Sequence, residues 1–203
     1  IEERFNAISH AFAAVAAFVG LILLVYYTSD KQILTQLSSF VYGISLLSVY
    51  ISSTLYHSVT VQKDKLFYQR LDHSCIFLLI AGTYTPLLLV SIGGLFAWIL
   101  FAIQWGLALI GIYFKWMHFN VFKRFSLSFY LLMGWLALLE IPQLYYSLPT
   151  SAFWLLIAGG LVYTTGVLFF ILDGKLPFAH FIWHLFVIVA STLHYFMIFS
   201  YVL

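Results

Sequence analysis

Residues 7–27, AISHAFAAVAAFVGLILLVYY, form an apolar run that contains no Asp, Glu, Lys or Arg. A helix that crosses a bilayer needs about 20 mostly apolar residues, so this run is long enough to span one. It lacks the basic segment that opens a secretory signal peptide, and we therefore interpret it as a transmembrane helix. The whole chain has the same character, with 64% hydrophobic and only 8% charged residues. This composition excludes a water-soluble globular protein.

Hydropathy, turn residues and charges divide the 203 residues into seven apolar spans joined by short connections. The longest connections run over 58–71 and 115–124, and the sequence contains no repeat or low-complexity stretch. The sequence therefore predicts an all-α integral membrane protein with one domain over residues 1–203. The predicted transmembrane helices lie near residues 7–27, 34–57, 72–91, 95–114, 125–141, 152–172 and 178–201.

Lysine and arginine gather on one side of the predicted bundle. On that side lie Arg4, Lys63, Lys65, Arg70, Lys115, Lys123, Arg124 and Lys175, at the N-terminus and in the second, fourth and sixth connections. Only Lys31 falls on the other side. The positive-inside rule then places the N-terminus in the cytoplasm and the C-terminus outside, in a cell membrane. A rhodopsin-like receptor needs the opposite orientation, and retinal attachment needs a lysine beyond Lys175, which is absent. The net charge of +2 is too small to indicate nucleic acid as a partner.

Polar residues cluster at the predicted cytoplasmic helix ends. An ionisable group inside a membrane segment costs about 2.5–3.5 kcal/mol on insertion scales, so each one needs a reason to be there. The spacing of Glu3, Asn6 and His10 puts them on one face of the first helix. The other members of the cluster are His57 at the end of the second helix, Asp72 at the start of the third, and His180 and His184 at the start of the seventh.

Three of these histidines predict a zinc site. His180 and His184 are four residues apart, which places both imidazoles on one helix face within reach of one ion. Together with His57 they supply three nitrogen ligands and leave a fourth position for water, the open arrangement of a catalytic zinc. Asp72 is then the group that holds or deprotonates the water. For Asp72 taken alone, an ion pair or hydrogen bond at the membrane surface, for example with Arg70 or His73, is a reasonable alternative.

Other polar residues fit structural roles. Small residues let transmembrane helices approach closely, which accounts for Ser45 and Ser48, whereas Ser53 is either a packing residue or a polar group beside the metal. Cys75 is expected as a buried packing thiol. We expect hydrogen-bond partners for His10 and His194, interfacial positions for His73 and His118, and solvated positions at helix ends for Asp30 and Glu140.

Three short motifs occur in order along the chain. They are E-x2-N in Glu3-Arg-Phe-Asn6, S-x3-H in Ser53-Thr-Leu-Tyr-His57, and H-x3-H in His180-Phe-Ile-Trp-His184. With these motifs, and with the segments 71–74 and 81–86 between them, the chain resembles the hemolysin III branch of the progestin and adipoQ receptor (PAQR) family, which includes the adiponectin receptors. The resemblance covers essentially the whole chain. The sequence shows no extended soluble N-terminal region or large outer loop, so we expect a compact microbial-type member.

The resemblance implies zinc bound at the positions of His57, His180 and His184, with Asp72 acting through the metal-bound water. It also implies a relation to membrane hydrolases such as the alkaline ceramidases. Our first hypothesis is therefore a zinc-dependent hydrolase that cleaves an amide, or an ester, of a membrane lipid, with Ser53 positioning the water or the oxyanion. The second is a regulator of membrane lipid state in which zinc is structural. The third and weakest is a pore-forming cytolysin, because the fourth, fifth and sixth helices are nearly all apolar.

Overall fold

The protein is described by a computed structural model that covers residues 1–203 and is entirely helical. Seven spans in it are long and apolar enough to cross a membrane, which confirms the predicted fold class. The elements are α1 (Glu2–Thr28), α2 (Ile33–Ser58), α3 (Gln62–Pro86), η1 (Leu87–Ile92), α4 (Gly94–Met117), α5 (Phe119–Phe122), α6 (Ser126–Trp135), η2 (Leu136–Glu140), α7 (Ile141–Ser147), α8 (Thr150–Ile171), α9 (Ala179–Met197) and η3 (Ile198–Val202).

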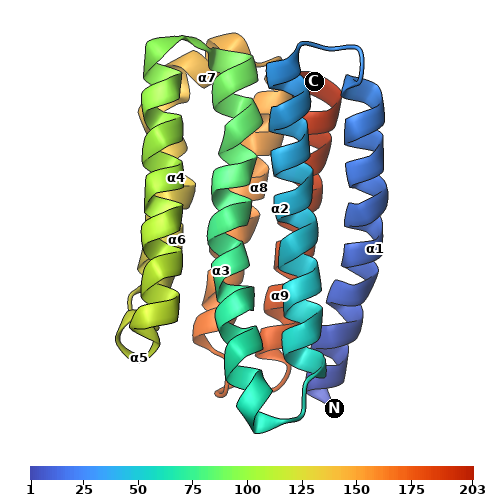
Figure 1. Ribbon diagram of the computed structural model, residues 1–203, viewed down its shortest axis with the longest axis vertical. Helices are drawn as coiled ribbons and strands as arrows, with labels where there is room; N and C mark the ends of the chain where they lie inside the picture. The colour runs from blue at the N-terminus through green and yellow to red at the C-terminus, as the bar shows by residue number, and fades with distance from the viewer.

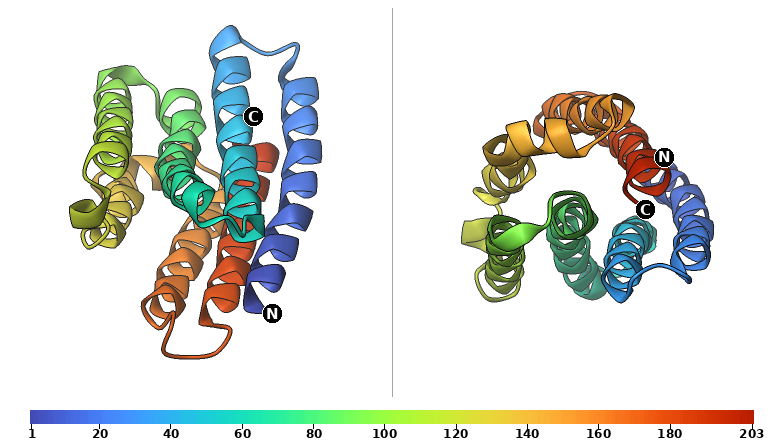
Figure 2. Two further views of the ribbon diagram at one scale, coloured as in Figure 1. Left: turned by 60° about the horizontal axis from the view of Figure 1, so that its bottom comes forward. Right: turned by 90° about the horizontal axis from the view of Figure 1, so that it is seen from above.

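The spans stand side by side in a ring (Figure 1 and the right-hand view of Figure 2). Each helix packs on the next, and α1 contacts α9, so that the first and last spans close the ring. The N-terminus, the end of α2 and the start of α9 lie together at the lower end of the bundle in Figure 1. We call this the site end, because the polar cluster lies there.

Serine and glycine bring α2 and α3 close together. A Cβ atom added at Gly82 would lie 2.6 Å from the Ser45 hydroxyl, so no larger residue fits at this crossing. The Ser45 hydroxyl itself donates a hydrogen bond to the carbonyl of Val41, one turn earlier in its own helix. The packing role predicted for Ser45 is thus visible in the contact with Gly82.

The fifth span is irregular, since its α-helix passes into a 3₁₀ segment after Trp135 and restarts at Ile141. Backbone groups freed inside a membrane protein must find partners within the protein. The Tyr84 hydroxyl accepts from the Ala137 N–H at 2.6 Å and donates to the Gly134 carbonyl at 2.7 Å. Gln104, the polar residue of α4, donates to the carbonyl of Met133 at 2.8 Å. These two side chains therefore stabilise the break.

Two connections differ from the prediction. The connection predicted over residues 58–71 is mostly helix, because α3 begins at Gln62 and its first turns are polar, a feature that hydropathy does not detect. Lys115 was counted in a loop, but it lies inside the last turn of α4 and is only 1% exposed.

The prediction for Glu140 is also wrong. It is 1% exposed, and neither carboxylate oxygen has a hydrogen-bond partner. The residue ends the 3₁₀ segment η2, and a sequence pattern does not indicate this local change of helical pitch.

Candidate metal centre

His57, His180 and His184 meet at the site end. His57 lies in the last turn of α2, while His180 and His184 lie on consecutive turns of α9. Their ring centroids are 4.8, 4.9 and 5.0 Å apart, so the three imidazoles form a nearly equilateral triangle. One ring nitrogen from each lies within 4.8 Å of the other two. The predicted cluster is therefore brought together by the fold.

The first of these imidazoles is oriented by Glu3. Its carboxylate oxygen Oε2 lies 2.5 Å from Nδ1 of His57, and a carboxylate only accepts, so Nδ1 carries the proton. The other oxygen of Glu3 accepts from Nζ of Lys65 at 2.8 Å. This lysine lies in the extra first turns of α3, so α1, α2 and α3 are tied together at the site.

The other two imidazoles have acceptors of their own. Nδ1 of His180 donates to Oδ2 of Asp173 at 3.0 Å, and Nδ1 of His184 donates to the backbone carbonyl of Asn6 at 3.3 Å. Asn6 was predicted to lie in the polar cluster, and its main-chain carbonyl forms this contact. Asp173 was not predicted. Its sequence signal was a carboxylate in the short turn before α9, seven residues ahead of His180.

The turn between α8 and α9 places Asp173 and His180 against each other. Gly174 has a φ of +75° and Phe178 a φ of +59°, so the backbone bends sharply twice. Proline at position 177 cannot continue a helix from α8, and α9 starts just after it. Phe178 is a non-glycine residue in the left-handed region, where it packs edge-on against Phe5 at 5.9 Å between ring centroids.

This arrangement fits a metal ion. With all three Nδ1 atoms donating hydrogen bonds, the free lone pairs belong to the Nε2 atoms, and Nε2 of His57 is buried without any protein partner. Histidines that bind a metal through one nitrogen commonly donate from the other to a carboxylate or a backbone carbonyl, which fixes the tautomer and ring orientation. A three-histidine donor set suits zinc and leaves further coordination positions open.

His10 stacks against the three-histidine cluster. Its ring lies parallel to that of His184, at 3.7 Å between centroids and an interplanar angle of 16°. It is 3% exposed, and neither ring nitrogen has a partner in the protein. The hydrogen-bond partner predicted for His10 is not found at its ring nitrogens, and the ring stacks on that of His184. For His194 the prediction is confirmed, since Nε2 bonds to the carbonyl of Leu156 at 3.1 Å.

Asp72 and Ser53 lie beside the three histidines. Both line an internal cavity that His180 and His184 also line, and the Ser53 hydroxyl faces the Asp72 carboxylate across the contact of α2 and α3. Asp72 forms no ion pair with Arg70 or His73. A carboxylate in this position can accept or donate a proton.

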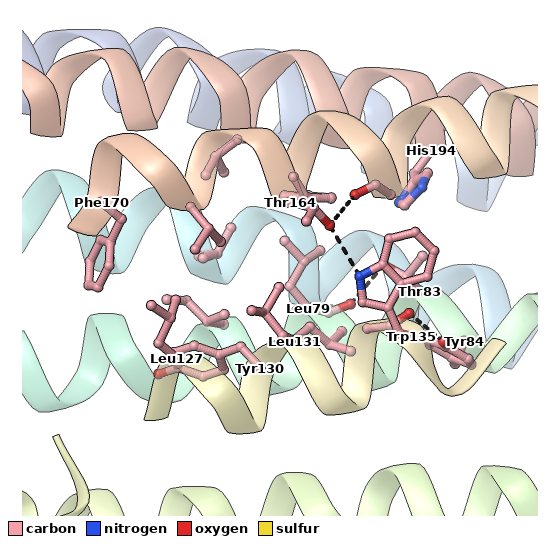
Figure 3. Close-up of a pocket in the computed structure, with 18 of the residues that line it drawn as sticks. Leu79, Thr83, Tyr84, Leu127, Tyr130, Leu131, Trp135, Thr164, Phe170 and His194 are labelled. Carbon is pink, nitrogen blue, oxygen red and sulfur yellow. Dashed lines mark hydrogen bonds between the residues drawn. The ribbon is translucent and has the colours of Figure 1, made fainter. Parts of the chain in front are cut away.

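The cavity runs from the site end toward the opposite end of the bundle. Its volume is about 260 Å³ and most of its lining residues are apolar. Figure 3 shows Leu79 of α3, Leu131 of α6 and Phe170 of α8 around it, with Nε1 of Trp135 donating to Thr164 at 3.2 Å. The cavity is therefore a mostly apolar chamber that opens on a polar cluster.

The two histidines that we expected at the membrane interface lie in different environments. His118 is exposed, as predicted. His73 instead faces the bundle interior, where its Nδ1 accepts a hydrogen bond from Nζ of Lys115 at 3.0 Å and its carbonyl accepts one from Tyr130. Neither histidine belongs to the metal cluster.

These features define a multi-pass membrane protein with a buried three-histidine centre able to hold a metal ion. The profile of the family described as "Haemolysin-III related" matches residues 1–195. The chain is 43% identical over 203 residues to "Hemolysin-3" of Bacillus cereus, and the aligned region covers 100% of this chain and 92% of the relative. It is 40% identical over 201 residues to the "Hemolysin-3 homolog" of Bacillus subtilis, with 98% of this chain and 94% of the relative covered.

A human relative is also similar. The chain is 34% identical over 206 residues to the human "Monocyte to macrophage differentiation factor", with 98% of this chain and 84% of the relative covered. The chain thus belongs to the haemolysin-III-related family, and the resemblance inferred from the three motifs is confirmed.

Proposed function

We propose that this protein is a zinc-dependent hydrolase that cleaves an amide, or with lower preference an ester, of a membrane lipid. The observation that carries the proposal is the set of three Nε2 atoms that the Nδ1 hydrogen bonds leave free, next to a carboxylate and an apolar cavity. Three imidazoles with open coordination positions are typical of catalytic zinc rather than of closed structural sites.

In this proposal His57, His180 and His184 hold the metal. Bound zinc supplies a Lewis acid for a carbonyl group and lowers the pKa of a coordinated water to about 7. The Asp72 carboxylate accepts the proton that the attacking water loses, and it returns a proton to the leaving amine. The Ser53 hydroxyl, which faces Asp72, orients that carboxylate or donates to the carbonyl oxygen of the lipid.

The cavity supports a lipid as the substrate. Its apolar walls accept an acyl chain and exclude water, so that the scissile bond lies at the polar end beside Asp72. Seven of the nine lysine and arginine residues, all except Lys31 and the buried Lys115, lie in or near the terminus and connections on the side of the site end. Under the positive-inside rule this distribution supports a site that faces the cytoplasm.

Metal content and turnover test the proposal together. We expect zinc in the purified wild-type protein by elemental analysis, and its loss in His57→Ala and His184→Ala. Hydrolysis of a fluorescent ceramide should be abolished by Asp72→Asn, which should retain zinc. Asp64→Asn is the matched control, because Asp64 is an exposed aspartate in the same helix. Bound zinc without turnover of any lipid amide or ester contradicts the hydrolase proposal.

The centre also joins α1, α2 and α9, so a bound metal would set the packing of segments far apart in the chain. This favours a second candidate function, a regulator of membrane lipid state with structural zinc. An Asp72→Asn variant with an unchanged cellular phenotype supports it. Pore formation is the weakest candidate, and ion flux through the pure protein in liposomes is its test.

A further inference from the structure

Lys115 is a buried cation that the metal centre does not use. It lies in the last turn of α4 and is 1% exposed. Its ammonium group donates one hydrogen bond, to Nδ1 of His73 at 3.0 Å. Its Nζ also lies 5.4 Å from the ring centroid of Phe119 and 5.9 Å from that of Tyr130. An aromatic ring at this distance attracts a cation weakly. An ammonium carries three N–H donors, so two are left for another acceptor.

No carboxylate neutralises this cation by direct contact. The ion pairs of the protein join Glu3 to His57 and Lys65, and Asp173 to His180. The charged groups within electrostatic range of Lys115 are Asp72 and a second cation, Lys123. Asp72 offsets one of the two positive charges, so this end of the cavity, where Lys115 is buried and Lys123 exposed, keeps a net positive charge. A net positive charge at the end of an apolar cavity attracts an anionic group.

Both lysines line the cavity that reaches the histidines. Lys115 and Lys123 contribute to its wall next to Asp72, while the rest of the wall is mostly apolar. The cavity thus combines an apolar body with an end that carries surplus positive charge. A molecule complementary to it has an apolar chain and one anionic group.

We propose that the lysine end of the cavity binds the anionic group of a single-chain lipid, a carboxylate or a phosphate, on the ammonium groups of Lys115 and Lys123. The inference rests on the proposed function, since it assigns an anionic class to the lipid that enters the same cavity. The anion has two sources: the carboxylate of a fatty acid released by hydrolysis, or the phosphate of a lipid that enters with its headgroup.

Binding of three probes with the same acyl chain tests the proposal. Radiolabelled oleate, oleyl phosphate and oleyl alcohol are titrated onto the immobilised full-length protein in a non-ionic detergent. We expect at least one anion to bind about tenfold or more tightly than the alcohol, because a hydrogen bond to a charged group is stronger than one to a neutral group. Preference for oleate identifies a fatty acid as the source, and preference for oleyl phosphate identifies a headgroup.

Variants locate the binding to the lysines. Lys115→Met and Lys123→Met should each weaken anion binding about tenfold and leave alcohol binding unchanged, whereas Lys115→Arg should retain the anion. Lys63→Met is the matched control, because Lys63 is exposed and does not line the cavity. Lys123 is also exposed, so its variant reports on binding even if Lys115→Met fails to fold.

Equal binding of the alcohol and both anions, or wild-type anion binding by both methionine variants, overturns the inference. Its failure is distinct from failure of the proposed function. A protein that binds anions through the lysines but contains no zinc and hydrolyses no lipid keeps the anion site and loses the hydrolase. A protein that hydrolyses a neutral lipid amide but binds neither anion keeps the hydrolase and loses the anion site.

Discussion

Replacing Glu3 by glutamine should weaken zinc binding without removing a ligand. The Glu3 carboxylate accepts from Nδ1 of His57 at 2.5 Å, the shortest of the three contacts that orient the histidines. Mutation of such an outer partner typically lowers metal affinity about 10–100-fold, or about 1.4–2.8 kcal/mol. A neutral amide keeps the size of the side chain but loses the charge that makes His57 a stronger donor to the metal. We therefore expect Glu3→Gln to lie in the upper part of this range.

Competition with a chromophoric zinc chelator, on protein purified in detergent, measures the affinity. Asp173→Asn provides the comparison, because its hydrogen bond to His180 is 3.0 Å long and its effect should be smaller. Lys65→Met removes the other partner of Glu3 and should change affinity by less than either. If Glu3→Gln and Asp173→Asn both bind zinc as tightly as wild type, while His57→Ala does not bind it, the outer contacts do not tune the site and our reasoning fails.

Three further predictions concern packing and burial. His10→Phe keeps an aromatic ring stacked beside the metal ligands and should retain zinc, whereas His10→Ala should lose about tenfold in affinity by the same chelator assay. Gly159→Ala should destabilise the fold by about 1–3 kcal/mol in thermal unfolding, because the new Cβ would lie 2.3 Å from the His194 ring. Gly160→Ala is the control and should leave the stability unchanged, because a Cβ there meets no neighbour. Glu140→Met should raise the unfolding midpoint, since it removes a buried carboxylate without a partner, and an unchanged or lower midpoint contradicts this.

Much of the centre was accessible from the sequence. The spacing of His180 and His184 fixes their common helix face, and the span boundaries put His57 at the same depth. These inferences need only helical periodicity and the thickness of a bilayer. Glu3 and Asn6 were also placed at the site by the face they share, although their separate contacts, a carboxylate with His57 and a main-chain carbonyl with His184, were not predictable.

The residues that the sequence did not reveal depend on contacts between distant segments. His10 received a hydrogen bond in our prediction because an isolated intramembrane histidine needs one, whereas the fold lays its ring on His184, far away in sequence. Lys115 looked like a loop residue because its charge ended the apolar run of α4. In the structure the aromatic rings of Phe119 and Tyr130 and the imidazole of His73 cover it.

The sequence by itself determined the class of this protein, its seven apolar spans and the identity of the candidate metal ligands. Those features follow from length, hydropathy and spacing within single helices, which are local properties of the chain. Only the tertiary structure decided which partner each Nδ1 has, that Asp72 faces Ser53 and not Arg70, and that Lys115 and Lys123 share a cavity with the histidines. The physical reason is that helix rotation and helix pairing are set by packing between segments far apart in the sequence, and no local pattern encodes them.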